Sequence, residues 1–212
     1  MPDKLREFRF LVLLVLLVLF FLISPLVEIA ELRRWPLLVA FAVLIFAAAN
    51  AASERRAHTV AAGVLALVAL SFNLIKLADV GSIFEILGDL SAICLLSFTV
   101  GVVLNLIVRQ DATNLNLLSG AAAVYLLLAL IWALSYRFIG DLAPGAFNGL
   151  SPDHHSSWTQ YLYFSLTTLT TLGYGDITPV NPFARIWVTF EAVVGVLYVA
   201  ILVARLVSLY RR

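Results

Sequence analysis

The residues whose types and spacing best suit a chemical task lie in one short stretch, residues 170–176, with the sequence TTLGYGD. The stretch lies between two long apolar segments, and irregular backbone at membrane depth is tolerated only where protein buries it or it lines a water-filled path. Gly173 and Gly175 alternate with larger residues, so the backbone can take conformations of alternating hand. Successive carbonyl oxygens could then face the same way, and four copies around an axis would form rings of oxygens that replace the water shell of a cation.

This stretch resembles the selectivity filter of potassium channels, with Leu172 where valine is more usual in that family. The resemblance continues through about residues 157–210. It implies that K⁺ is the permeant ion, that no cofactor is needed, and that the Thr171 hydroxyl adds the innermost ring of oxygens. Gly175 completes the ion-binding stretch and lets the chain turn outward. The backbone carbonyls expected to bind K⁺ are those of Thr171, Leu172, Gly173 and Tyr174.

The same resemblance implies supporting roles for residues around the filter. The Tyr174 ring would point away from the ions and pack against the pore helices, and Asp176 would form a hydrogen bond with Tyr163. Thr167 stands where some family members have a glutamate, so filter inactivation that depends on this acid is not expected. Thr170 would end the helix that precedes the filter and would help to support it.

A short helix must place this filter. Residues 157–160 fit a capping box, which predicts a helix that begins there and ends near Thr170. A helix of about 12 residues is too short to cross a bilayer. Its C-terminal end carries roughly half a negative charge, so four such ends would stabilise a cation below the filter. The pattern therefore predicts a re-entrant pore helix.

The last apolar segment begins after two prolines, Pro179 and Pro182, of which the second suits the first position of a helix. Gly195 falls where the family has its hinge glycine, although glycine there would also permit close packing against the pore helix. Valines at helical spacing follow, and by resemblance they line the inner cavity. No charged ring is expected among them, so no site for intracellular blocking cations is predicted. They are Val196, Val199, Val203 and Val207.

Glu191 is an acid at membrane depth, one turn before Gly195. Ionisable residues inside membranes are costly and count as functional hypotheses. We expect Glu191 to face the hydroxyl groups of the pore helix, where it would support the filter. A structural hydrogen bond and a gating role both remain open, as does the charge of the acid. The hydroxyls in question belong to Ser165, Thr167 and Thr168.

Composition sets the class of the whole chain. Of its 212 residues, 62% are hydrophobic and only 13% are charged, a balance typical of a membrane protein. The formal net charge of +1 gives no reason to expect a nucleic-acid partner. Cys94 has no partner cysteine in the chain, and no group of residues has the spacing of a metal site or of a catalytic centre. We therefore expect a membrane protein that is not an enzyme.

Six apolar segments are long enough to cross a bilayer as helices of roughly 20 residues. The fold class expected is an all-α membrane protein with six transmembrane helices and a pore helix and filter loop between the fifth and sixth. The first segment is longer than a signal-peptide core and lacks a cleavage site, so we expect it to be retained. Because the sequence stops at Arg212, no cytoplasmic ligand-binding domain is expected. The segments cover about residues 8–27, 35–52, 57–77, 84–108, 117–139 and 183–210.

Charges in the loops predict the orientation. With the N-terminus inside, the cytoplasmic side has nine basic and four acidic residues, and the outer side has five basic and eight acidic residues. This asymmetry satisfies the positive-inside rule. We expect both termini to be cytoplasmic, in a multi-pass protein of the plasma membrane whose filter opens outward. Residues 140–156, rich in glycine, proline and aspartate, should form an exposed and mobile outer loop.

The chain divides by prediction into a four-helix region, residues 1–112, and a pore domain, residues 113–212. The first region has the topology of a voltage sensor, but its fourth helix has no basic residue before Arg109. Moving one charge through 100 mV is worth about 2.3 kcal/mol, so one terminal arginine supplies almost no energy for voltage-dependent opening. We expect weak voltage dependence and a scaffolding or lipid-facing role for the first four helices.

The function expected is passive K⁺ conduction through a homotetrameric, K⁺-selective pore in the lipid bilayer. One alternative is a non-conducting or modulatory subunit of a heteromeric channel, against which the intact filter argues. Another is a potassium uptake subunit, but such proteins pack four pore repeats into one polypeptide and this chain has one. The stimulus that opens the pore is not indicated by the sequence.

Overall fold

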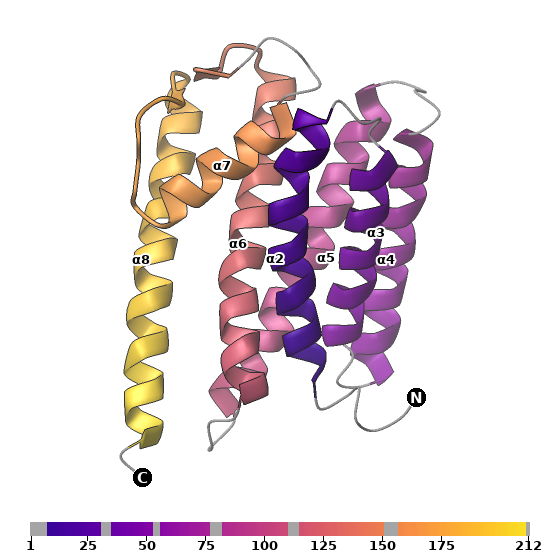
Figure 1. Ribbon diagram of the computed structural model, residues 1–212, viewed down its shortest axis with the longest axis vertical. Coiled ribbons are helices and arrows are strands. Elements are labelled where there is room, and N and C mark those ends of the chain that lie inside the picture. Colours follow the sequence, from indigo (N-terminus) through magenta and orange to yellow (C-terminus); the bar gives the residue numbers. More distant parts are fainter. Residues whose placement is uncertain are drawn as a thin grey trace. The chain divides into compact units, whose positions relative to one another are not determined.

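The computed structural model describes residues 8–30, 35–52, 56–76, 82–109, 115–150 and 157–210, and these are almost wholly helical (Figure 1). The all-α class of the prediction is confirmed. Two short strands pair near the filter. The helices are α2 (Arg9–Ile29), α3 (Trp35–Ala51), α4 (Arg56–Lys76), α5 (Ser82–Arg109), α6 (Leu115–Leu142), α7 (Ser157–Leu169) and α8 (Pro182–Tyr210), and the strands are β1 (Phe147–Asn148) and β2 (Thr178–Pro179).

Long runs of leucine, valine and alanine form these helices, and within the described residues four helices are long and apolar enough to cross a membrane. Shorter apolar stretches occur in α3 and α4, at Pro36–Ala51 and Arg56–Phe72. These helices identify the chain as a membrane protein. That six helices cross the bilayer stays a prediction. The four long stretches are Arg9–Val27, Ile86–Arg109, Leu115–Leu142 and Pro182–Arg205.

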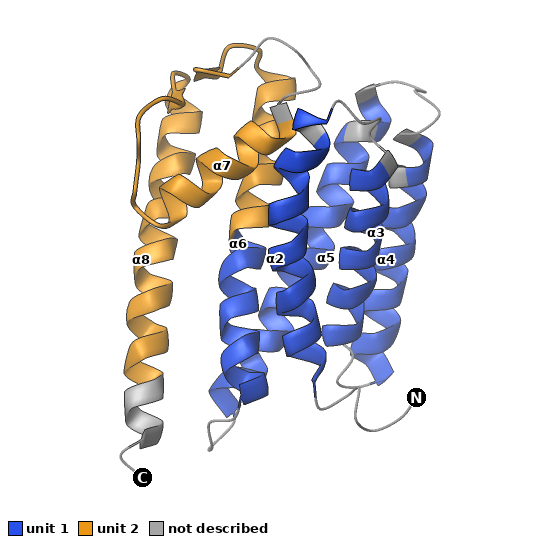
Figure 2. Ribbon diagram, viewed as in Figure 1, with its two compact units in different colours: residues 1–128 blue, residues 129–212 orange. Residues whose placement is uncertain are grey.

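The chain forms two compact units, residues 1–128 and 129–212, and the boundary falls inside α6 (Figure 2). A continuous helix therefore belongs to both units. The predicted boundary between the four-helix region and the pore domain, at residue 112, is a functional division and stays a prediction.

In the first unit, α2 packs on α3, and α3 and α4 both pack on α5. Small side chains predominate in the core of these helices, which lets the helix backbones approach closely. At the start of α2, the backbone N–H of Phe10 donates to Asn116 Oδ1 at 3.1 Å, and the Phe10 ring covers Gly120. The core cluster consists of Ile45, Ala52, Ala62, Ala66, Ala69, Leu95 and Val102.

Helix α5 carries no basic residue before its last turn, where Arg109 donates a hydrogen bond to Asn105 Oδ1 at 2.9 Å. Asp89, near the other end of α5, is buried. No ladder of arginines runs along this helix, and the weak voltage dependence inferred from that fact remains a prediction.

In the second unit, α7 lies oblique to α6 and α8, and it packs on α8 (Figure 1). An aromatic cluster joins α6, β1 and α7, with ring centroids 5.0–6.1 Å apart. Strands β1 and β2 pair antiparallel, with Phe147 opposite Pro179, so the segment after α6 is tied to the segment before α8. The cluster consists of Tyr136, Phe147, Tyr161 and Phe164.

Candidate ion-conducting site

The end of α7 sets the start of the filter. The Thr167 carbonyl accepts two hydrogen bonds, from the N–H groups of Leu172 at 2.8 Å and Gly173 at 3.1 Å. The N–H of Thr171 donates to the carbonyl of Thr168 at 2.9 Å. These bonds satisfy carbonyls that a helix end would otherwise leave free, and they reverse the chain. The short helix predicted before the filter is present, and it ends at Leu169 as its last residue.

The filter backbone alternates in hand. Thr171, Gly173 and Gly175 have φ values of +59°, +53° and +78°, while Leu172 and Tyr174 between them do not have positive φ. Such alternation turns successive carbonyls of an extended ribbon toward one side. A methyl group on Gly173 or Gly175 would meet no atom of this chain within 4 Å, so the positive φ is what requires glycine there. The backbone alternation inferred from the sequence is confirmed, and its role in ion binding stays a prediction.

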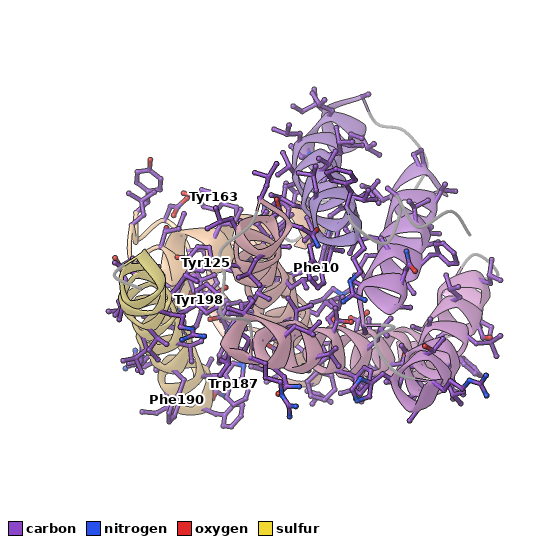
Figure 3. The ribbon with its side chains drawn as sticks, turned by 90° about the horizontal axis from the view of Figure 1, so that it is seen from below. Phe10, Tyr125, Tyr163, Trp187, Phe190 and Tyr198 are labelled. Atoms are coloured by element: carbon purple, nitrogen blue, oxygen red, sulfur yellow. The ribbon has the colours of Figure 1, made fainter. Side chains whose placement is uncertain are left out.

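The side chain of Asp176 is hydrogen-bonded to a residue of the pore helix. The Tyr163 hydroxyl donates to Asp176 Oδ2 at 2.8 Å, which confirms this predicted contact. The Tyr163 ring, labelled in Figure 3, also stacks on Tyr174, with centroids 6.3 Å apart and planes 8° from parallel. Desolvation, and then the hydrogen bond to Asp176, raise the pKa of Tyr163, so the phenol stays a donor at neutral pH.

The two threonines predicted to support the filter donate their side-chain hydrogen bonds to backbone carbonyls of α7. Thr167 Oγ1 donates to the Phe164 carbonyl at 3.0 Å, and Thr170 Oγ1 donates to the Leu166 carbonyl at 2.7 Å. The Thr167 side chain is therefore engaged with its own helix, while its carbonyl holds the filter.

The described part of the outer loop is mostly exposed, as expected, but Ala146 and Phe147 within it are buried, and the loop contacts the filter's outer end. Gly149 has a φ of +85°, and a Cβ there would lie 1.9 Å from the Asp176 carbonyl oxygen. The N–H of Val180 donates to the Ala146 carbonyl at 2.8 Å, and Phe147 is buried. Sequence reasoning missed this contact, although an aromatic residue between glycines in a polar loop was a signal for it.

Glu191 is fully buried between three segments of the second unit. Ser165 Oγ on α7 lies 2.5 Å from Glu191 Oε1, and the Tyr136 hydroxyl on α6 donates to Oε2. Ser165 Oγ also lies 2.7 Å from the Ala129 carbonyl oxygen. The predicted approach of Glu191 to pore-helix hydroxyls is confirmed for Ser165, whereas Thr167 bonds elsewhere. No local pattern pointed to Tyr136, which is 55 residues away along the chain.

Gly195 packs directly on the end of the pore helix. A Cβ on Gly195 would lie 2.1 Å from the Leu169 carbonyl oxygen. This supports the close-packing interpretation of Gly195, and the hinge interpretation stays a prediction.

The inner part of α8 is largely uncovered by its own chain. Val196, Val199 and Val203 are 55%, 48% and 52% exposed, and Val207 lies in the part of α8 whose side chains are outside the described set. Between Glu191 and Arg205 this helix has no charged residue. The valines are thus available to line a cavity, as predicted, although the cavity itself is not formed by one chain.

Residues 124–212 match the family model described as "Ion channel". The chain is 33% identical over 89 residues to the inward rectifier potassium channel Kirbac3.1 of Paramagnetospirillum magnetotacticum. The matched region covers 42% of this chain and 28% of that protein. It is 36% identical over 84 residues to two pore potassium channel c of Oryza sativa, covering 40% of this chain and 18% of that protein. The chain thus spans less than a third of the length of these two relatives.

A shorter relative is matched over most of its length. The chain is 28% identical over 78 residues to the potassium channel protein kcv of Paramecium bursaria Chlorella virus 1. The matched region covers 37% of this chain and 82% of that protein. The resemblance to potassium channels inferred from the filter is confirmed by these matches. They place residues 124–212 among ion channels and not among enzymes.

Proposed function

From the premise that residues 124–212 are an ion channel segment of the potassium channel kind, we propose that the chain is one subunit of a K⁺-selective pore. The observation that carries the proposal is the alternating backbone of Thr171, Gly173 and Gly175 directly after the pore helix. Carbonyl oxygens arranged in this way replace the hydration shell of K⁺ without a charged side chain.

The pore is a homotetramer in this proposal. Residues 170–176 are all exposed in the single chain, with Leu172 56% and Tyr174 68% exposed. Backbone polar groups at membrane depth must be covered by protein or line a water-filled path. Neighbouring copies of the same loop satisfy this requirement, because they close the ring of carbonyls around the ion.

The inner cavity is uncharged in this proposal and is lined by Val196, Val199, Val203 and Val207. An apolar lining offers no site for blocking cations from the cytoplasm, and it can close the pore by dewetting. The orientation with both termini cytoplasmic, six membrane crossings and a plasma-membrane location rests on the loop charges.

Recording currents from the purified protein in planar bilayers tests the function. With K⁺ on one side and Na⁺ on the other, the reversal potential should lie far from zero in the direction of K⁺ selectivity. A reversal potential near zero would contradict K⁺ selectivity and indicate a non-selective pore. Absence of any current from correctly inserted tetramers would favour the non-conducting subunit instead.

Substitution Gly173→Ala is the matched variant for this experiment. Alanine at a φ of +53° is strained by about 1 kcal/mol or more, so the filter should lose its conducting conformation. Because no atom of the chain blocks the added methyl group, membrane insertion and assembly should be retained. We expect normal tetramers on gel filtration with no K⁺ current.

A further inference from the structure

Glu191 lies outside the predicted ion path, yet it is the point at which three segments of the second unit meet. Its carboxyl group reaches Ser165 on α7 and Tyr136 on α6, and Ser165 in turn reaches the Ala129 carbonyl on α6. The side chain has no exposed surface, and it lies within one of the stretches able to span a membrane.

Counting the hydroxyl and carboxyl protons in this cluster shows whether the Glu191 carboxyl group is ionised or neutral. Ser165 has one hydroxyl proton, but its oxygen lies 2.5 Å from Glu191 Oε1 and 2.7 Å from the Ala129 oxygen. If Glu191 were ionised, both neighbours would be acceptors and only one could receive the proton. If Glu191 is neutral, it donates to Ser165, Ser165 donates to Ala129, and Tyr136 donates to the other carboxyl oxygen. Only the neutral acid makes all three contacts hydrogen bonds, as buried polar groups require.

The positions of the charged groups around the cluster also favour a neutral Glu191. The described basic residues of α8 are Arg185 and Arg205, about two and four turns away along the helix, and Arg185 donates to the Pro179 carbonyl. On α6, Arg137 follows Tyr136 but lies over the Trp158 ring, 5.3 Å from its centre. Helix α7 has no charged residue. The described hydrogen-bond partners of the Glu191 carboxyl group, Ser165 and Tyr136, are hydroxyls and not cations, and an unpaired charge at membrane depth is costly.

We propose that Glu191 is a positioning residue that acts as a neutral acid, donating a hydrogen bond to Ser165 and accepting one from Tyr136, and so fixes the pore helix between α6 and α8. Ser165 lies two residues before Thr167, whose carbonyl holds the N–H groups of Leu172 and Gly173. A shift of α7 at Ser165 is thereby passed to the filter. The effect on selectivity rests on the proposed function, whereas the protonation state of Glu191 does not.

Selectivity measurements with conservative variants test the positioning role. Glu191→Gln keeps one donor and one acceptor with almost the same shape, so its K⁺/Na⁺ permeability ratio should equal that of the wild type. Glu191→Ala and Ser165→Ala leave buried partners without hydrogen bonds, and each ratio should fall roughly tenfold. Ser119→Ala is the matched control, because Ser119 is also buried but bonds only to the Leu115 carbonyl of its own helix. A Gln variant as impaired as the Ala variant would overturn the proposal.

An infrared spectrum of the assembled protein at neutral pH tests the protonation state without any current. The carbonyl stretch of a neutral carboxylic acid should be present in the wild type and should lose intensity in Glu191→Gln. Asp89→Asn is the control, because Asp89 is the other buried acid among the described residues. If the difference between wild type and Glu191→Gln shows only carboxylate bands, the neutral acid is wrong. A wild type that carries no K⁺ current overturns the proposed function and leaves this spectral test intact.

Discussion

At the scale of single residues, Tyr163 joins the pore helix to the outer end of the filter. Its hydroxyl bonds the Asp176 carboxylate and its ring stacks on Tyr174. The two contacts differ in kind, because the hydrogen bond needs the phenolic proton and the stacking does not. A substitution can therefore remove one and keep the other.

We predict that Tyr163→Phe preserves K⁺ selectivity but makes the current decay faster during sustained opening, because Asp176 loses its donor. The raised pKa of Tyr163 means that this bond is fully present below the ordinary tyrosine value of about 10 and is lost only as pH rises through the folded value. The wild-type decay should thus be insensitive to pH around neutrality and accelerate only at strongly alkaline pH. Patch recordings at several pH values measure this, and identical decay in wild type and variant would contradict it.

Local sequence signals predicted the filter, while two of the contacts between distant residues were not predicted. The capping pattern at residues 157–160 and the alternating glycines act within a few residues, so both the pore helix and the filter backbone followed from them. The contacts of Glu191 with Tyr136 and of Gly149 with Asp176 depend on how helices and loops pack, which a local pattern does not specify.

At the scale of elements, the contact between α7 and α8 depends on the missing side chain of Gly195. The Leu169 carbonyl occupies the space where a Cβ would stand. The helix ends were predicted to within a few residues, since the apolar segment 117–139 became α6, Leu115–Leu142. Errors of this size are usual where helix termini fray or extend into the interface.

We predict that Gly195→Ala destabilises the assembled protein by about 1–3 kcal/mol, because α7 and α8 must separate to admit the methyl group. Thermal unfolding of the detergent-solubilised protein measures the loss. Gly101→Ala on α5 is the matched control: its Cβ meets nothing within 4 Å, so the variant should be unchanged or slightly more stable. Equal stability of the two variants would rule out the close contact.

At the scale of the whole molecule, the described helices α2 to α5 precede α6 and the pore segment, and the matching family model covers residues 124–212. The first unit is built from apolar helices with small core residues and has no basic residue in α5 before Arg109. The expectation that this unit does not act as a charged voltage sensor rests on this composition and stays a prediction.

We predict a shallow conductance–voltage curve for the reconstituted channel, equivalent to less than about one elementary charge, since each charge crossing 100 mV supplies only about 2.3 kcal/mol. Arg109→Gln should leave the curve unchanged, because Arg109 bonds Asn105 at the end of α5. A steep curve that Arg109→Gln flattens would assign voltage sensing to this helix after all.

The continuity of α6 has a mechanical consequence. This helix runs unbroken from Leu115 to Leu142, without proline, across the boundary between Leu128 and Ala129. A rod of this kind is about 42 Å long at 1.5 Å per residue and resists bending. At Ala129 and Tyr136, α6 contacts Ser165 of the pore helix and Glu191, so a rotation of this part of the helix about its axis would move both contacts together.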